Sequence, residues 1–232
     1  MPIYQHETVE VVPGQLREYF DGLERLYLPM SGDRRLHLVG FFQTSGNSGR
    51  WPEAVAIWEV DDWETHVWQR KTAGSHAGLH QYMKDALGWR TGGFDRILIP
   101  VSFSPRPPRR PEVRSPGAVC MQQTFLVRPT QARGFLDAVQ KEIVPRAAEG
   151  ELTLQAFWRS TFRPLEYLAL WSMPDWDAYG RVLARRDPED EGSNLPGLGS
   201  AFEHLTDLEE KILIPASFSP LGGAERSSVY TV

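Results

Sequence analysis

Apolar and polar positions follow the same order of patterns twice along this chain. Residues 3–12 and 119–127 are rich in β-forming side chains, and each stretch precedes a segment with helical apolar spacing, over 15–28 and 129–148. Two strands then follow in each copy, over 37–44 and 54–60 and over 153–160 and 167–173. A second helical region starts at the acidic residues Asp61-Asp62 or Asp175, and closing strands are predicted at 97–99 and 212–214. The pattern predicts β-α-β-β-α-β in each copy.

The closing strand gives the clearest sign of duplication. The segment Ile97–Pro105 returns as Ile212–Pro220, with Ile-Leu-Ile-Pro-x-Ser-Phe-Ser-Pro in both. An internal repeat of this kind indicates two homologous modules. We therefore predict a first repeat over residues 1–105, a Pro- and Arg-rich linker over 106–117, a second repeat over 118–220 and a C-terminal tail over 221–232.

The order β-α-β-β-α-β is the ferredoxin-like plan, in which a four-stranded antiparallel sheet carries both helices on one face. Each repeat then has one uncovered sheet face, and two such faces in one chain can cover each other. The predicted fold is α+β, with two ferredoxin-like repeats packed sheet to sheet as an intramolecular barrel. The space between the sheets is the expected ligand cavity. In the second repeat, residues 187–194 interrupt the helical pattern and are expected to form a surface excursion.

Composition narrows the possible surroundings and partners of the protein. With 232 residues, of which 41% are hydrophobic, the chain is long and apolar enough for a sizeable core. No apolar run approaches the ~18 residues of a membrane span, and the first residues lack a signal-peptide pattern, so we expect a cytoplasmic protein without membrane contact. The net charge of −5 argues against nucleic-acid binding. The single cysteine, Cys120, lies in an apolar strand and is expected to be a buried thiol.

Three features carry a family resemblance: the strand-to-helix step Pro13-Gly14, the third-strand pairs Ile57-Trp58 and Leu170-Trp171, and the closing motif of each repeat. On these features the chain resembles the NIPSNAP family of the dimeric α/β-barrel superfamily. The resemblance implies a barrel of two ferredoxin-like halves, here supplied by one chain. Relatives in the wider superfamily include cofactor-free monooxygenases, polyketide cyclases, lyases, isomerases and haem proteins, and a fold does not choose among these.

Histidines are the first candidates for chemistry because they titrate near neutrality and often act as general acid or base. Five of the six lie in the first repeat and only His204 lies in the second, which favours a reactive first half; drift is the open alternative. His76 and His80 share a helix face, but no metal-binding motif surrounds them, so neither a metal nor an organic cofactor is expected. Glu7, which aligns with Gln123, can serve as base or orient a histidine. The predicted catalytic set is His6, Glu7, His66, His76 and His80.

Aromatic side chains on the central strands indicate the kind of ligand. Core packing is the safer interpretation of any single ring, but with tryptophans on strands of both halves we expect an apolar, aromatic-lined pocket. The predicted substrate-binding residues are Phe42, Trp58, Trp158 and Trp171, with Arg159 as a polar anchor.

Two hypotheses follow from these residues. The first is an enzyme without organic cofactor that acts on a small aromatic or polyketide-like molecule by oxygenation, cyclisation or lyase or isomerase chemistry, with a histidine as general base. The second is a non-catalytic NIPSNAP-type module that binds a ligand or a protein. The expected partner is a small apolar or aromatic molecule, and a homodimer of the tandem chain is possible.

Overall fold

The computed structural model describes residues 1–107, 118–185 and 200–222. The first half contains β1 (Ile3–Val11), α1 (Leu16–Gly22), η1 (Leu23–Tyr27), α2 (Leu28–Ser31), β2 (His37–Thr44), β3 (Glu53–Val60), α3 (Trp63–Thr72), η2 (Ala73–Ser75), α4 (Ala77–Ala86) and β4 (Arg90–Pro100). The second half contains β5 (Val119–Val127), α5 (Ala132–Ala138), η3 (Val139–Ile143), α6 (Val144–Glu149), β6 (Thr153–Ser160), β7 (Glu166–Met173), α7 (Trp176–Ala184), η4 (Ser200–His204) and β8 (Leu205–Pro215).

The predicted elements appear in the predicted order. The closing strands β4 and β8 begin earlier than the predicted 97–99 and 212–214. The largely polar residues that precede Ile97 and Ile212 also pair with β1 and β5. The predicted interruption at 187–194, most of the predicted linker and most of the predicted tail lie outside the described residues. None of the helices in the described segments is long and apolar enough to cross a membrane.

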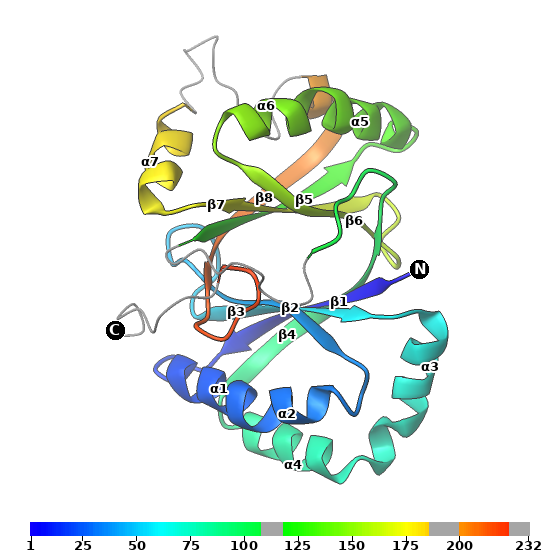
Figure 1. Ribbon diagram of the computed structural model, residues 1–232, viewed down its shortest axis with the longest axis vertical. Coiled ribbons are helices and arrows are strands. Elements are labelled where there is room, and N and C mark those ends of the chain that lie inside the picture. Colours follow the sequence, from blue (N-terminus) through cyan, green and yellow to red (C-terminus); the bar gives the residue numbers. More distant parts are fainter. Residues whose placement is uncertain (108–117, 186–199, 223–232) are drawn as a thin grey trace.

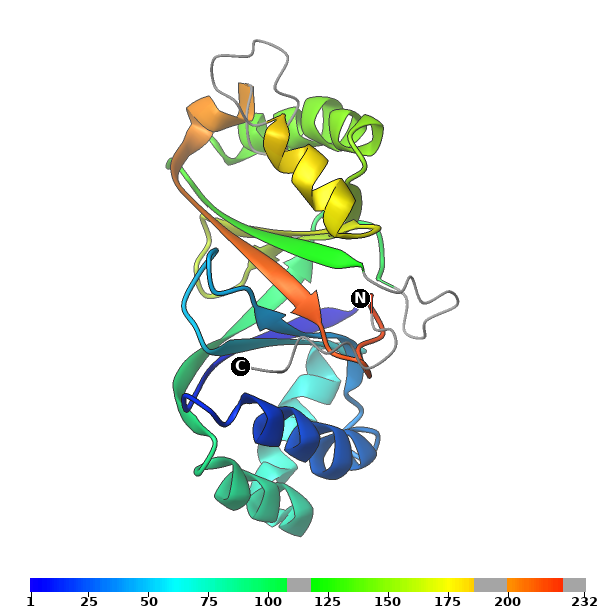
Figure 2. The same ribbon diagram turned by 90° about the vertical axis from the view of Figure 1, so that its left-hand side faces the viewer.

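The strands form one closed antiparallel barrel in the order β1-β3-β2-β8-β5-β7-β6-β4. Within it, the first half contributes the sheet β4-β1-β3-β2 and the second half the sheet β8-β5-β7-β6, and the two sheets join through β2–β8 and β4–β6 pairing. The sheets face each other across the middle of the molecule, and the helices of each half cover its outer face (Figure 1; Figure 2). This confirms the predicted α+β class and the predicted closure of a barrel within one chain.

Strand alternation divides the core into three layers. On β1, Ile3 and Val9 point to the helices of the first half, whereas Tyr4 belongs to the cluster inside the barrel. The helices of the second half pack on their own sheet in a third cluster that includes Phe125 and Phe135. Cys120 is a buried member of the barrel cluster, as expected from its strand.

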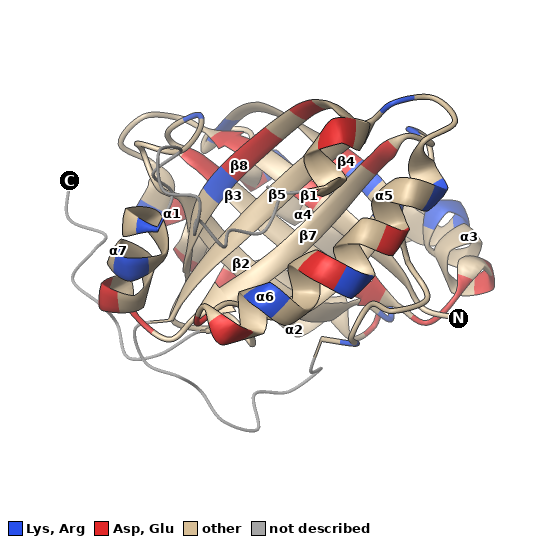
Figure 3. Ribbon diagram, turned by 90° about the horizontal axis from the view of Figure 1, so that it is seen from above, with Lys and Arg blue, Asp and Glu red and all other residues tan. Residues whose placement is uncertain are grey.

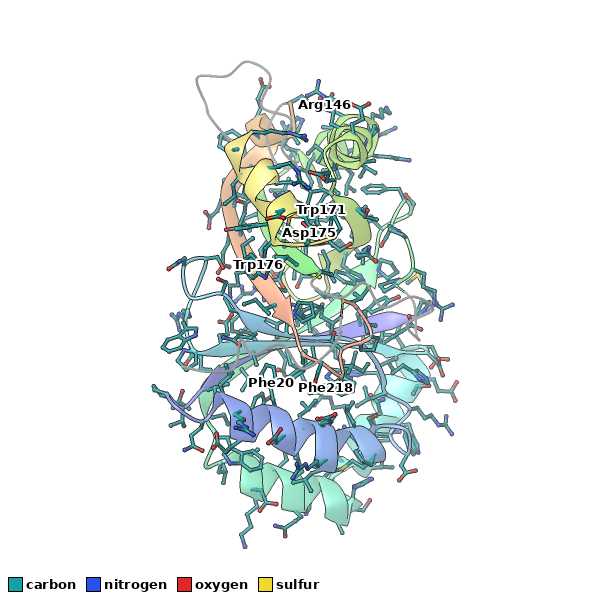
Figure 4. The ribbon with its side chains drawn as sticks, turned by 60° about the vertical axis from the view of Figure 1, so that its left-hand side comes forward. Phe20, Arg146, Trp171, Asp175, Trp176 and Phe218 are labelled. Carbon is teal, nitrogen blue, oxygen red and sulfur yellow. The ribbon has the colours of Figure 1, made fainter. Side chains whose placement is uncertain are left out.

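The repeated closing motif links the two halves reciprocally. Phe218 follows β8 of the second half, yet its ring stacks on Phe41 of the first half with a centroid distance of 5.2 Å. It also lies beside Phe20 of the first half, at 6.3 Å between ring centroids (Figure 4). Phe103 follows β4 and meets Phe157 of the second half at 5.4 Å. The serine next to each phenylalanine accepts a backbone N–H of the other half, from Phe41 N to Ser219 Oγ at 3.0 Å and from Phe157 N to Ser104 Oγ at 2.8 Å. The motif therefore fastens each half to the other.

Two buried ion pairs also cross between the halves. Arg96 on β4 donates to Glu166 on β7 at 2.8 Å, and Lys211 on β8 donates to Glu53 on β3 at 2.9 Å. Lys211 is the single basic residue of β8, and Figure 3 shows this basic band beside a run of acidic residues on the same strand. Each of these charges occupies the same register position in its own half, so the pairs are related by the symmetry of the barrel.

Proline shapes the first helical run in both halves. Pro29 and Pro145 lie in the first turn of α2 and α6, directly after the π-helical turns η1 and η3. Proline has no N–H to donate, and its ring clashes with a carbonyl of the preceding turn, which a wider turn relieves.

Candidate functional site

A pocket of about 220 Å³ opens between the first sheet and the helices of the first half. Its floor is β1, where Gln5, Glu7 and Val9 point away from the barrel interior. In Figure 1, the helices α1, α2 and α4 lie below this sheet. Strand β4 pairs with β1 and also contributes lining residues. The remaining lining side chains are Tyr19, Leu23, Tyr27, Arg34, Arg70, Ala73, Leu79, Tyr82, Met83, Arg90 and Asp95. We call this space the Glu7 pocket.

Glu7 is a carboxyl in a low-polarity setting. Burial, and then the neighbouring Asp95 carboxylate, raise the pKa of Glu7 to about 7. The two residues are paired across β1 and β4. The Trp58 indole lies near enough to oppose the shift weakly, although its Nε1 makes no hydrogen bond of normal geometry in the described part of the chain. At neutral pH, Glu7 is divided between the acid and the carboxylate, which suits a group that takes and returns protons.

Three tyrosines surround the space above Glu7. Tyr27 lies between Tyr82 and Trp58, with ring centroid distances of 4.9 Å and 5.2 Å. Burial raises the pKa of Tyr19, Tyr27 and Tyr82, so all three remain phenols at neutral pH. The Tyr27 hydroxyl accepts a hydrogen bond from Arg34 Nη1 at 2.7 Å and keeps its own proton for donation. The pocket therefore combines one poised carboxyl with neutral hydroxyl donors.

His66 contacts the floor of the Glu7 pocket through Gln5. Gln5 Nε2 donates to His66 Nδ1 at 3.2 Å and to Gln69 Oε1 at 3.1 Å, so His66 supports the polar floor through Gln5. Burial, followed by the charge of Arg70, lowers the pKa of His66. His66 is neutral at pH 7 in this arrangement.

The other predicted histidines lie elsewhere. His6 points into the barrel, where its Nε2 donates to Gln122 Oε1 at 2.7 Å, and burial lowers its pKa to about 4. His76 caps α4 by accepting the Leu79 backbone N–H at its Nδ1, at 3.1 Å. His80 is an exposed residue of α4. The structure therefore brings together Glu7, Gln5 and His66, and it does not bring the four histidines into one cluster.

The predicted aromatic set is divided among the three core layers. Phe42 and Trp158 lie inside the barrel, whereas Trp58 and Trp171 lie under the helices of the first and the second half. Arg159 is exposed. Side chains two residues apart along a strand share a face, and neighbours do not, so a list of strand aromatics does not define one pocket. The candidate pocket lies on the opposite face of the first sheet from the space between the sheets that the sequence pattern favoured.

Sequence reasoning missed the tyrosines and arginines of the Glu7 pocket. A signal was present in the repeat alignment, because Tyr19 and Tyr27 correspond to Phe135 and Ile143 at equal spacing from Glu7 and Gln123. Aligned positions that carry a hydroxyl in one copy and only carbon in the other indicate where the first half has a polar pocket and the second half has an apolar core.

Comparison with protein families adds one assignment. Residues 122–220 match the family model NIPSNAP. The second half of the chain carries a NIPSNAP domain. This confirms the family resemblance that the closing motifs indicated. The NIPSNAP domain match does not include the Glu7 pocket, which lies in the first half.

Solved structures show the same fold along nearly the whole chain. A protein from Lactobacillus acidophilus, proposed to be a monooxygenase, matches with a TM-score of 0.64 and 13% identity, over 97% of this chain and 98% of that one. A second proposed monooxygenase, from Fusobacterium nucleatum, matches with a TM-score of 0.67 and 10% identity over 92% of both chains. A NIPSNAP-like domain protein from Burkholderia xenovorans is 24% identical over 46% of this chain and 91% of that one, with a TM-score of 0.41. No curated protein sequence matches the chain significantly.

Proposed function

We propose that the Glu7 pocket is the active site of a small-molecule enzyme in which Glu7 acts as the general base. The supporting observation is the carboxyl itself: it is partly buried, paired with Asp95 and has a pKa of about 7. General bases work best with a pKa near the operating pH. Glu7 takes this role in place of a histidine, because no histidine is among the described residues that line the pocket.

The pocket chemistry supports a substrate that forms an enolate or a phenolate. In the proposed step, the Glu7 carboxylate removes a proton from a C–H next to a carbonyl or from a phenolic O–H. The electron pair stays on the substrate as an oxyanion, which accepts a hydrogen bond from a neutral tyrosine. Returning the proton to a different carbon completes an isomerisation, and returning it after attack on a second carbonyl of the same molecule completes a cyclisation. Neither outcome needs a cofactor.

The volume limits the substrate to a small molecule. About 220 Å³ is below the roughly 300 to 1,000 Å³ of pockets that enclose drug-sized ligands. Leu23, Leu79 and Met83 supply an apolar wall, which suits an aromatic ring or a short polyketide-like chain.

We also propose that the two halves are tandem ferredoxin-like repeats. Support comes from the matching strand orders, from the reciprocal serine and phenylalanine contacts of the closing motifs, and from the paired buried charges. Under this interpretation, the first repeat carries the Glu7 pocket, and the second serves to complete the barrel.

A hydrogen-exchange assay tests the proposal even while the substrate is unidentified. A panel of small 1,3-diketones, β-keto acids and dihydroxyaromatic acids is incubated with the protein in D₂O, and loss of C–H signals is followed by NMR, with an oxygen electrode in parallel. Glu7→Gln should reduce any catalysed exchange by roughly 10² to 10⁴. The matched control is Glu18→Gln, an exposed carboxyl on α1, which should leave exchange unchanged.

Three results would change the assignment. Equal rates for wild type and Glu7→Gln would remove Glu7 as the base. Oxygen consumption that depends on Glu7 would select oxygenation among the possible reactions. Ligand binding without any exchange or oxygen uptake across the panel would favour the binding-module hypothesis instead.

A further inference from the structure

Arginines reach the Glu7 pocket from three separate elements: Arg34 from the segment before β2, Arg70 from α3, and Arg90 from the start of β4. Arg34 is already engaged, because its Nη1 donates to the Tyr27 hydroxyl. The one side-chain hydrogen bond of Arg90 among the described residues goes to the Met83 sulfur, a weak acceptor, at 3.5 Å. Arg70 has no hydrogen bond or ion pair with any described residue.

These guanidinium groups are not balanced by the carboxyls of the pocket. Asp95 makes no ion pair within 4.0 Å in the described part of the chain, although Arg70 and Arg90 lie close enough to influence it electrostatically. Glu7 is the second acidic group that faces the space. Since the tyrosines are neutral, three arginines face at most two carboxylates, and the pocket carries excess positive charge.

We propose that the substrate of this pocket is a carboxylate, and that Arg70 and Arg90 bind its anionic group while Glu7 faces the part of the molecule that loses a proton. This inference rests on the proposed active site and specifies its substrate class. A carboxylate fits better than a bulkier phosphate ester because the pocket is small and because a planar guanidinium matches a planar carboxylate in paired hydrogen bonds. The apolar wall then contacts the uncharged body of the acid.

Arg70, Arg90 and Glu7 reach the pocket from three different elements. Arg70 follows Gln69 near the C-terminal end of α3, and Arg90 begins β4, whereas Glu7 lies in the middle of β1. A substrate whose carboxylate binds these arginines leaves its uncharged part to the remaining lining of the pocket, which includes Glu7 and the tyrosines. We expect a hydroxylated aromatic acid or a short keto acid.

Matched pairs of acid and amide test this inference directly. The probes are benzoate with benzamide and salicylate with salicylamide, and binding is measured by calorimetry or ligand-observed NMR on the full chain. A charge-assisted hydrogen bond contributes about 1.5 to 3 kcal/mol, which corresponds to roughly tenfold or more in Kd, so wild type should prefer each acid by at least about tenfold. Arg70→Gln and Arg90→Gln should each reduce this preference, and the double variant should abolish it.

The control variants separate this inference from the proposed reaction. Arg159→Gln removes an exposed arginine in the second half and should keep the preference for acids. Glu7→Gln should keep or strengthen acid binding, because it removes a negative charge from the pocket while it removes the base. Acid preference without any catalysed proton exchange would overturn the proposed reaction and support the carboxylate site.

Other outcomes overturn the carboxylate site itself. Equal binding of acid and amide would do so, as would an acid preference that survives in the double arginine variant. Binding of phenyl phosphate more tightly than benzoate would replace the carboxylate with a phosphate. Failure of both acids to bind at millimolar concentration would also count against the proposal.

Discussion

The two halves of this protein share a backbone plan and differ in what lies under their helices. In the second half, the position of Glu7 is held by Gln123, which accepts the Trp171 indole N–H at 2.8 Å and donates to Glu210 at 2.6 Å. Phe135 and Ile143, which correspond to Tyr19 and Tyr27 of the first half, both lie in a buried apolar cluster. In the first half the same positions carry a carboxyl pair and phenols around an open space.

A few side chains account for the difference between the apolar cluster of the second half and the Glu7 pocket of the first. A buried amide can satisfy its neighbours with hydrogen bonds and stay neutral at any pH, whereas two adjacent carboxyls cannot both ionise without cost. The first half has Glu7 where the second has Gln123, and Tyr19 and Tyr27 where the second has Phe135 and Ile143, and its cluster holds a titrating group. The fold supports either use.

The largest effect is expected from giving the first half the residues of the second. The double variant Glu7→Gln, Tyr27→Ile should lose roughly 10² to 10⁴ of any exchange activity, because it removes the base and a hydroxyl donor together. Thermal unfolding should show a folded protein, since the second half accommodates the same side chains. A double variant that remains fully active would show that Glu7 and Tyr27 are not the residues that distinguish the two halves in function.

The reciprocal motifs predict equal effects in the two halves. Phe103→Ala and Phe218→Ala each remove a partly buried ring that packs on the other half, and each should lower the free energy of unfolding by about 2 to 4 kcal/mol. Urea unfolding monitored by circular dichroism measures both. If one substitution costs several times as much as the other, the two contacts are not equivalent.

The titration of Glu7 should make the unfolding free energy depend on pH in a way that the neutral Gln123 of the second half does not. The pKa of Glu7 is about 7 in the folded chain against an ordinary value of 4.5, so folding favours the protonated form. The stability that this contributes is fully present below pH 4.5 and is lost as the pH rises through 7. Relative to Glu7→Gln, the wild type should therefore lose about 2 to 3 kcal/mol of unfolding free energy between about pH 4.5 and 7.5.

The contribution of His6 to the unfolding free energy has the opposite dependence on pH, so His6 serves as a control. Its pKa falls from 6.5 to about 4 on folding, so its contribution is lost as the pH drops from 6.5 toward 4. His6→Gln should accordingly remove an acid-side loss of stability, measured by the same denaturation series. A difference between wild type and Glu7→Gln that does not vary with pH would show that Glu7 titrates normally.

A smaller effect should distinguish the two tryptophans. Trp171→Phe removes the indole N–H that Gln123 accepts, and the loss of one such hydrogen bond costs about 0.5 to 1.5 kcal/mol of unfolding free energy. Trp58→Phe breaks no hydrogen bond of normal geometry among the described residues. The two substitutions remove the same ring volume, so Trp58→Phe should lower the unfolding free energy by less than Trp171→Phe. Equal losses of unfolding free energy would mean that Trp58 bonds to Glu7 as firmly as Trp171 does to Gln123.

Periodicity and repetition in the sequence were sufficient for the fold. The closing motif in two copies predicted two modules, and apolar spacing located the strands β2, β5 and β6 to the residue and the other elements approximately. These features are local, since a strand or helix requires a pattern only among its own residues. Glu7 was included among the candidates because it aligns with Gln123 and carries a carboxylate that can act as a base.

Only the tertiary structure decided which candidates meet. His6 and Glu7 are neighbours in sequence, yet one contacts Gln122 across the barrel and the other faces the helices of its own half. The pocket unites β1, α3, α4 and β4, whose distances along the chain carry no information about the space they enclose. The pKa of Glu7 likewise depends on burial and on Asp95, which is remote in sequence and paired with it in the sheet. Proximity and desolvation arise from packing, and a linear pattern does not contain them.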